Sequence, residues 1–200
     1  IIARLNPRGE RASRLPVAGT PRASIDAIEE ALGPRTSSAR RQAAARRAVS
    51  IAQQNGWTDN RMAFSLFALG RLTLAGEADV ALASFLQARQ IYRARPETRL
   101  HAAHVAMQLA AFALSSNQPA AAIELVDSSL PPVREAENAS LLATLLMIKA
   151  EALDLQGRVV EARKLRLDSL GWARYGFGSD EEVRDRLAEI AALSPVRRGS

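Results

Sequence analysis

Apolar residues recur along most of this chain at the spacing of an amphipathic helix, and no segment shows the sustained alternation of β-branched and polar residues that predicts a strand. A short helix is predicted from Ser24, whose hydroxyl can cap it, to Gly33. Longer helices are predicted over residues 37–55, 60–75, 79–93, 97–115, 119–129, 133–156 and 158–175. The pattern therefore predicts an all-α protein.

The two ends of the chain differ from this helical middle. Residues 1–23 are rich in Arg, Pro and Gly and are predicted to form a flexible leader, followed over 24–56 by N-terminal helices with a basic face. Near the other end, a capping-box spacing precedes an apolar stripe. We therefore expect a C-terminal capping helix over 179–194 and a short tail over 195–200.

One sequence block occurs three times between residues 57 and 178. Each copy has a turn residue, a small residue five positions on, a bulkier residue four later and another small residue three later. The copies are Gly76, Ala81, Phe85 and Ala88; Asn117, Ala122, Val126 and Ser129; and Gly157, Ala162, Arg166 and Ser169. They recur at intervals of 41 and then 40 residues. Small residues seven apart lie on one helical face and let a neighbouring helix approach closely, so the blocks predict an α-solenoid of antiparallel helix pairs.

The first copy resembles the Gly-x4-Ala-x3-Phe-x2-Ala block that opens the second helix of the tetratricopeptide repeat (TPR) family. The later copies keep the small positions but have Val126 and Arg166 in place of the aromatic residue. The period exceeds the roughly 34 residues of that family, which we attribute to longer helices and connections such as that at Pro131 and Pro132. HEAT-like repeats fit the length, but their Pro-kinked first helix has no counterpart here. The resemblance implies a divergent TPR-like solenoid that acts as a non-catalytic adaptor or scaffold for another protein.

The resemblance also implies a partner-binding groove along the first helix of each pair. The groove residues would be Leu66, Thr73, His104, Met107, Gln108, Thr144, Met147 and Glu151. The Lys, Asn and Arg residues with which some members of the family clamp a peptide carboxylate are absent from these positions. A largely apolar groove suits an amphipathic helix or an extended apolar peptide, and the chain's own N-terminal helices could also fill it.

Aromatic residues gather near the end of the repeats, in a chain that is only 4% aromatic. They are Trp172, Tyr175 and Phe177. These residues either close the last repeat against the capping helix or form a hot spot for a partner, because Trp and Tyr are enriched at such positions.

The net charge of +6 resides in residues 1–47, where ten arginines face four acidic residues. A basic arm is formed by Arg35, Arg40, Arg41, Arg46 and Arg47. The arm could tether the solenoid to nucleic acid, an anionic membrane or an acidic subunit of a larger complex. It could equally be an ordinary solvated face, since the Arg and Ala bias is typical of a GC-rich bacterial genome. No aromatic residue occurs between Ile1 and Asn55, so base stacking is not expected there.

Catalytic chemistry is not expected. The chain has no cysteine, no phosphate-binding loop and no nucleophile elbow. His101 and His104 are three residues apart, but the nearest acidic residue in sequence is Glu97 and a metal site needs a third ligand. We therefore expect no enzymatic activity, no cofactor, no metal and no small-molecule substrate.

A third hypothesis is that the chain is the sensory or structural part of a larger enzyme or regulator. The sequence begins Ile-Ile rather than Met, which is compatible with a signal or anchor segment before it. No stretch reaches the roughly 20 apolar residues of a membrane span. We expect a protein that is soluble as given, in the bacterial cytoplasm or periplasm, and lean toward the cell envelope.

Overall fold

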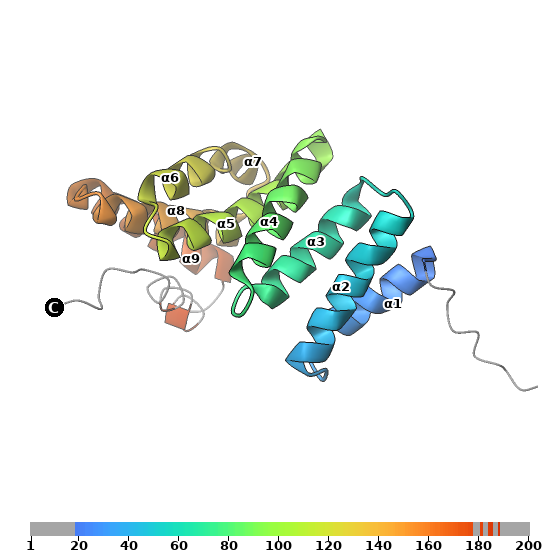
Figure 1. Cartoon of the computed structure of the whole chain (residues 1–200). Helices are drawn as coiled ribbons and strands as arrows, with labels where there is room; N and C mark the ends of the chain where they lie inside the picture. The colour runs from blue at the N-terminus through green and yellow to red at the C-terminus, as the bar shows by residue number, and fades with distance from the viewer. Residues whose placement is uncertain (1–18, 178–180, 182–183, 186–187, 189–200) are drawn as a thin grey trace, which may run out of the picture.

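The computed structural model describes residues 19–177, 181, 184, 185 and 188, and every regular element among them is helical (Figure 1). The elements are α1 (Pro21–Leu32), α2 (Ser38–Gln54), α3 (Asn60–Thr73), α4 (Ala78–Arg93), the 3-10 turn η1 (Pro96–Thr98), α5 (Arg99–Ser115), α6 (Pro119–Asp127), α7 (Leu130–Glu135), α8 (Ala139–Leu155) and α9 (Val159–Phe177). The all-α prediction is confirmed for this part of the chain. Residues 1–18, most of the predicted capping helix over 179–194 and the tail over 195–200 lie outside the described residues.

Each helix packs against the one before it, so that the chain advances from α1 at one end of the molecule to α8 and α9 at the other (Figure 1). The first copy of the repeated block lies on α4, the second on α6 and the turn after it, and the third on α9. Each of these helices contacts the long helix that precedes it, namely α3, α5 or α8. The small residues of all three copies are buried. The block is therefore a helix-packing motif in each of its positions.

One of these close approaches joins α3 to α4. A Cβ atom added to Gly70 would lie 2.7 Å from Cε1 of the fully buried Phe85, nearer than two carbon atoms can pack. Phe67 adds a tilted ring contact to Phe85, with centroids 6.0 Å apart. A glycine on α3 thus makes room for the aromatic residue of the first repeat block.

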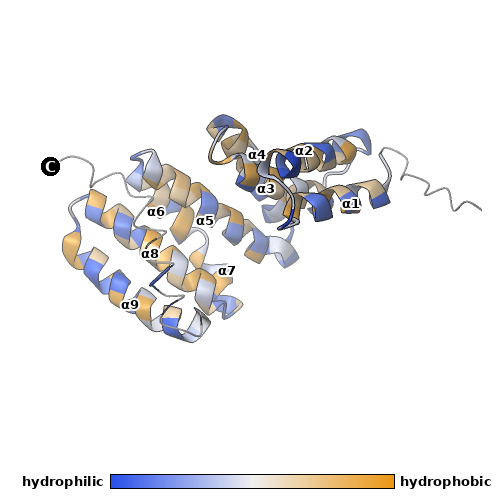
Figure 2. Cartoon of the chain, turned by 90° about the horizontal axis from the view of Figure 1, so that it is seen from below, coloured by the Kyte–Doolittle hydropathy of each residue, from blue (hydrophilic) through white to orange (hydrophobic). Residues whose placement is uncertain are grey.

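Two clusters of buried residues form the core, and α5 belongs to both. Val105 and Leu109 join the cluster beneath α1–α4, whereas Ala110 and Leu114 join the cluster formed with α6–α9. The same two groups of helices are visible on either side of the molecule in Figure 2. Because α5 is covered on two faces, its sequence is apolar nearly all round rather than along one stripe.

Two helix boundaries differ from the prediction. The first helix begins at Pro21 rather than at Ser24, because the Thr20 hydroxyl caps it by accepting a hydrogen bond from the Ala23 amide at 3.1 Å. The helix predicted over 133–156 is wrong, because two helices occupy that range. Glu137 has a left-handed backbone (φ 49°), which ends α7, and the side chain of Asn138 then caps α8.

Turn residues of the second and third blocks end helices in the same way. Asn117 and Gly157 have positive φ angles of 56° and 77°. In each case the following amide donates to a carbonyl five residues back, from Gln118 to Ala113 and from Arg158 to Leu153. Gly and Asn are the residues that adopt this left-handed conformation at least cost, which explains their presence at these two turns.

Candidate functional site

A cleft that carries exposed aromatic and apolar side chains lies where α7, α8 and α9 meet. It has a volume of about 790 Å³. Its lining residues are Arg134, Glu137, Leu142, Leu167, Asp168, Gly171, Trp172 and Tyr175. Most come from α9, where positions 168, 171, 172 and 175 follow one another on one helical face. We refer to this feature as the aromatic cleft.

The aromatic cleft combines a fixed floor with an exposed rim. Trp172 is half-buried and packs on the core cluster beneath α8, while Tyr175 is 81% exposed. The two rings meet edge to face, with centroids 6.5 Å apart. Leu167, one helical turn before Gly171, is 64% exposed. Aromatic and aliphatic side chains are thus presented to solvent at this end of the molecule.

Backbone contacts hold this end of α9 closely on α8. A Cβ atom at Gly176 would lie 2.5 Å from the Ser140 amide nitrogen, so the backbones of α9 and α8 touch where no side chain intervenes. The Ser140 hydroxyl donates to the Gly176 carbonyl at 2.8 Å, and the buried Ser169 hydroxyl donates to the Ala143 carbonyl at 2.8 Å. Trp172 and Tyr175 therefore stand on a helix whose position is fixed.

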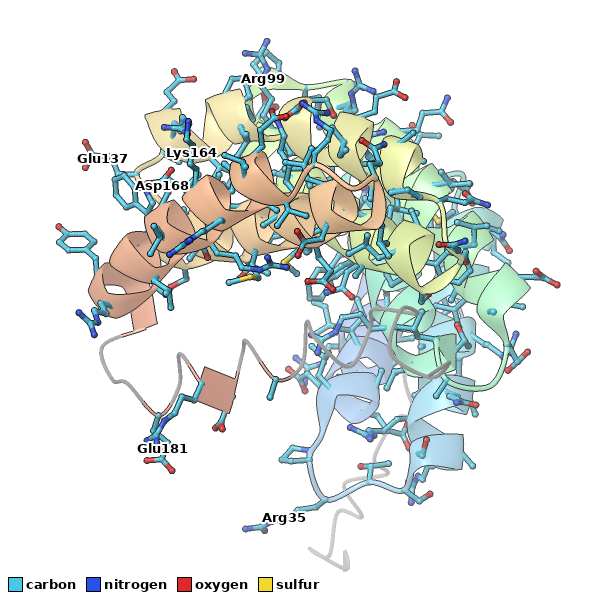
Figure 3. The ribbon with its side chains drawn as sticks, turned by 90° about the vertical axis from the view of Figure 1, so that its left-hand side faces the viewer. Arg35, Arg99, Glu137, Lys164, Asp168 and Glu181 are labelled. Atoms are coloured by element: carbon cyan, nitrogen blue, oxygen red, sulfur yellow. The ribbon has the colours of Figure 1, made fainter. Side chains whose placement is uncertain are left out.

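Charged side chains surround the apolar part of the cleft. Asp168 and Glu137 lie on the same side of the molecule in Figure 3, and Arg134 also lines the cleft. One positive and two negative groups on the rim resemble the polar edge of a protein interface around a less polar centre. They do not form the concentrated single-sign surface that nucleic acid requires.

The structure corrects part of the predicted groove. Leu66, Thr73 and Met147 are buried, with exposed fractions of 4%, 0% and 7%. Leu66 belongs to the core cluster that includes Val49 of α2, because α2 packs against α3. The Thr73 hydroxyl donates within its own helix to the Leu69 carbonyl at 2.8 Å. These three side chains do not line an open groove.

The other predicted groove residues are half-buried, and most already have partners within the chain. Glu151 accepts a hydrogen bond from Arg166 at 2.9 Å, and the Thr144 hydroxyl donates to the Ser140 carbonyl at 2.9 Å. His104 Nδ1 lies 3.0 Å from the Leu100 carbonyl oxygen. Met107 packs against the second core cluster, and Gln108 is half-buried beside it on α5.

The predicted basic arm is largely paired within the chain. Arg40 and Arg47 on α2 both bond to the Glu30 carboxylate on α1, and Arg46 reaches Glu77 at 2.5 Å. These hydrogen bonds, first from Arg40 and then from Arg47, hold the pKa of Glu30 below its usual value. The pairs join α1 to α2 and α2 to the start of α4.

Two arginines of the arm have other surroundings. Arg35 projects from the turn between α1 and α2, at the far end from the aromatic cleft (Figure 3). Arg41 lines a separate cleft of about 520 Å³ with Phe64 and Arg71, and its Nε atom is buried there without a hydrogen-bond partner. The five arginines therefore do not form one continuous surface.

The two histidines were weighed above as metal ligands. No group of three His, Asp or Glu side chains among them could bind a metal ion. His101 stacks on the Tyr92 ring with centroids 5.3 Å apart, and so acts in packing.

Sequence reasoning named Trp172 and Tyr175 but missed the remaining residues of the cleft. Phe177 ends α9, and its side chain lies outside what the structure describes. The helical spacing from Trp172 would have indicated Asp168 on the same face. Arg134 and Glu137 gave no signal, because their place depends on the break between α7 and α8.

Comparison with known proteins adds no relative. No protein-family model matches this sequence, and no curated protein matches it significantly. Among the described helices, none combines the length and the apolar character that a bilayer crossing needs. The functional argument therefore rests on the residues of this chain.

Proposed function

We propose that this protein is a non-catalytic interaction module, a divergent TPR-like α-solenoid of antiparallel helix pairs closed by a C-terminal capping helix, which serves as an adaptor or scaffold subunit. Its partner is another protein. A helix or an extended apolar segment of that partner binds in the aromatic cleft. The repeated burial of the same small positions on α4, α6 and α9 supports the solenoid. The predicted groove residues are buried or half-buried, and most of them already have partners within the chain. This favours the aromatic cleft over the groove as the site that binds the partner.

The exposure of Tyr175 carries the functional part of this proposal. Large apolar side chains left in water cost free energy that burial would recover, roughly 25 cal/mol for each Å². Tyr175, Leu167 and the half-buried Trp172 stand together on one rigid helical face. Trp and Tyr in a partly formed pocket are the residues that contribute most at protein interfaces.

The mixed charges of the cleft indicate the character of the partner segment. Arg134 can pair with an acidic group, whereas Asp168 and Glu137 can pair with basic groups. A partner helix with an apolar face flanked by both signs of charge would complement this surface. Charge at the rim would then affect the rate of association and the choice of partner more than the affinity.

Site-specific photocrosslinking tests the proposal. A photoreactive phenylalanine analogue at position 175 is compared with the same analogue at position 160, since Val160 is also on α9 and is 72% exposed, yet does not line the cleft. In extracts of the native source, we expect a discrete protein adduct from position 175 only. Equal labelling from both positions, or none from position 175, would contradict the proposal. If the same analogue placed at the arginine positions of the basic arm gives adducts while position 175 gives none, the electrostatic alternative is favoured.

A further inference from the structure

Three arginines converge on a second cleft, at the junction of α4, η1, α5 and the α6–α7 turn. Arg89 and Arg93 are one helical turn apart at the end of α4, and Arg99 begins α5. The cleft has a volume of about 340 Å³. The other lining residues are Ala102, Ala103, Ser128, Ser129, Pro131 and Pro132.

Within the described part of the chain, no carboxylate forms a salt bridge with these three arginines. Among the described residues, none of the three guanidinium groups has a carboxylate within the 4.0 Å of a salt bridge. Arg89 is half-buried and donates only to the Ser128 hydroxyl, at 3.0 Å. Glu124 is the acidic residue that acts on Arg89, and it does so from beyond that distance. This contrasts with the basic arm, where Arg40, Arg46 and Arg47 all reach carboxylates.

Two further features favour an anion in this cleft. Burial first, and then the positive charge of Arg93, lower the pKa of Arg89, which shows that its environment disfavours a cation without a counter-charge. The start of α5 has no side-chain cap, and the Thr98 hydroxyl donates to the Tyr92 carbonyl at 2.5 Å. The positive end of that helix dipole adds to the arginines.

From this juxtaposition we infer that the cleft between Arg89, Arg93 and Arg99 is a binding site for a compact phosphate-bearing small molecule. Planar guanidinium groups match phosphate oxygens in a bidentate fashion and keep their charge at any physiological pH. The volume is at the small end of ligand sites, which span roughly 300–1,000 Å³. No aromatic side chain lines the cleft, so a nucleobase would find no stacking surface. The ligand is therefore one or two phosphate groups on a small body.

This site is independent of the aromatic cleft. Arg99 lies apart from Glu137 and Asp168 in Figure 3, and no residue lines both clefts. The α7 helix nevertheless separates the two, because Pro131 and Pro132 face the arginines whereas Arg134 faces the aromatic side chains. A bound anion would contact the same short helix that borders the partner cleft.

Calorimetric titration of the full chain with sodium pyrophosphate tests the inference, with inorganic phosphate as a second ligand and sodium chloride at matched ionic strength as the blank. The variant Arg93→Gln/Arg99→Gln removes two exposed side chains that hold no internal partner, so its circular dichroism spectrum is expected to be unchanged. The charge-matched control is Arg95→Gln/Arg163→Gln, which changes two exposed arginines outside the cleft.

We expect the double variant to weaken pyrophosphate binding by about tenfold or more for each arginine removed, as charge-assisted hydrogen bonds do. The control is expected to stay within about threefold of the native affinity, since it loses only long-range charge. Equal weakening in both variants, or no binding to the native chain, would overturn the inference. Tight binding of an acidic peptide without any binding of pyrophosphate would also overturn it, in favour of a protein ligand. The single variant Arg99→Gln preserves the test if the double variant does not fold.

Discussion

Replacing Gly70 with alanine tests whether α3 and α4 approach as closely as the structure requires. Two effects oppose each other. Alanine in a helix interior is more favourable than glycine by about 1 kcal/mol. Against this, the added methyl would lie 2.7, 2.8 and 3.0 Å from three atoms of the Phe85 ring, which is fully buried. Carbon atoms pack at about 3.5–4.0 Å, so the ring or a helix must move by nearly 1 Å.

Overpacking of this kind costs about 1–3 kcal/mol. Since the propensity gain of about 1 kcal/mol offsets part of that cost, we expect Gly70→Ala to lower the free energy of unfolding by up to about 2 kcal/mol. Urea unfolding followed by far-UV circular dichroism measures the change. A matched control is Gly171→Ala in α9, where nothing lies within 4 Å of the added atom. That variant should be more stable than the native chain by up to about 1 kcal/mol.

A double variant separates the clash from other causes. Phe85→Leu shortens the side chain that meets the new methyl, so Gly70→Ala should cost less in that background than in the native chain. The coupling free energy is expected to be about 0.5–3 kcal/mol, the range for residues in direct contact. If Gly70→Ala instead stabilises the protein as Gly171→Ala does, the close packing of α3 on α4 is refuted.

Three further predictions concern charge and burial. Hydrogen bonds lower the pKa of Glu30 in the folded protein, so its contribution to stability is present above the ordinary pKa of 4.5 and is lost as the pH falls below that value. In a plot of the urea midpoint against pH, Glu30→Gln should therefore reduce the slope on the acid side. Burial raises the pKa of Tyr92 to about 12, so its contribution to stability is present below pH 10 and is lost as the pH rises toward 12. Ultraviolet titration of a variant in which Tyr92 is the single tyrosine should show that it ionises well above pH 10. Arg166→Ala should lower the free energy of unfolding by about 1–2 kcal/mol, because it leaves Asp154 half-buried without its cation. Arg158→Ala, which breaks the exposed ion pair with Glu161, should leave the urea midpoint unchanged.

Much of the helical architecture could be predicted from local patterns. The period of apolar residues located eight of the nine α-helices in the described part of the chain, because burial of one face produces that period whatever the partner helix. Its failure at 133–156 has a local cause: Glu137 adopts a left-handed backbone, which the sequence does not signal, since Gly or Asn usually occupies such a position. The repeat block predicted the buried faces of α4, α6 and α9 for the same physical reason, since small residues seven apart allow close approach.

The sites were less accessible to sequence reasoning, because they depend on contacts between distant segments. Leu66 has the same local pattern whether α2 covers it or not, and only the packing of α2 on α3 decides its burial. Arg40 and Glu30 are separated by the α1–α2 turn, so the charge count of the arm did not reveal their pairing. The cluster of Arg89, Arg93 and Arg99 was missed for the converse reason. Basic and acidic residues balance over residues 48–200, whereas no carboxylate of the described residues forms a salt bridge with these three arginines.

The affinity of a captured partner segment for Tyr175→Ala tests the central claim most directly. Measured by calorimetry at low and high salt, with Val160→Ala as the control on the same helix, the loss should be about 30-fold, corresponding to a hot-spot truncation of about 2 kcal/mol. The account predicts that this loss is confined to Tyr175→Ala and is similar at both salt concentrations, because the contact is mainly apolar. Native affinity in Tyr175→Ala, or affinity that falls steeply with salt and with substitution of the basic arm, would contradict it.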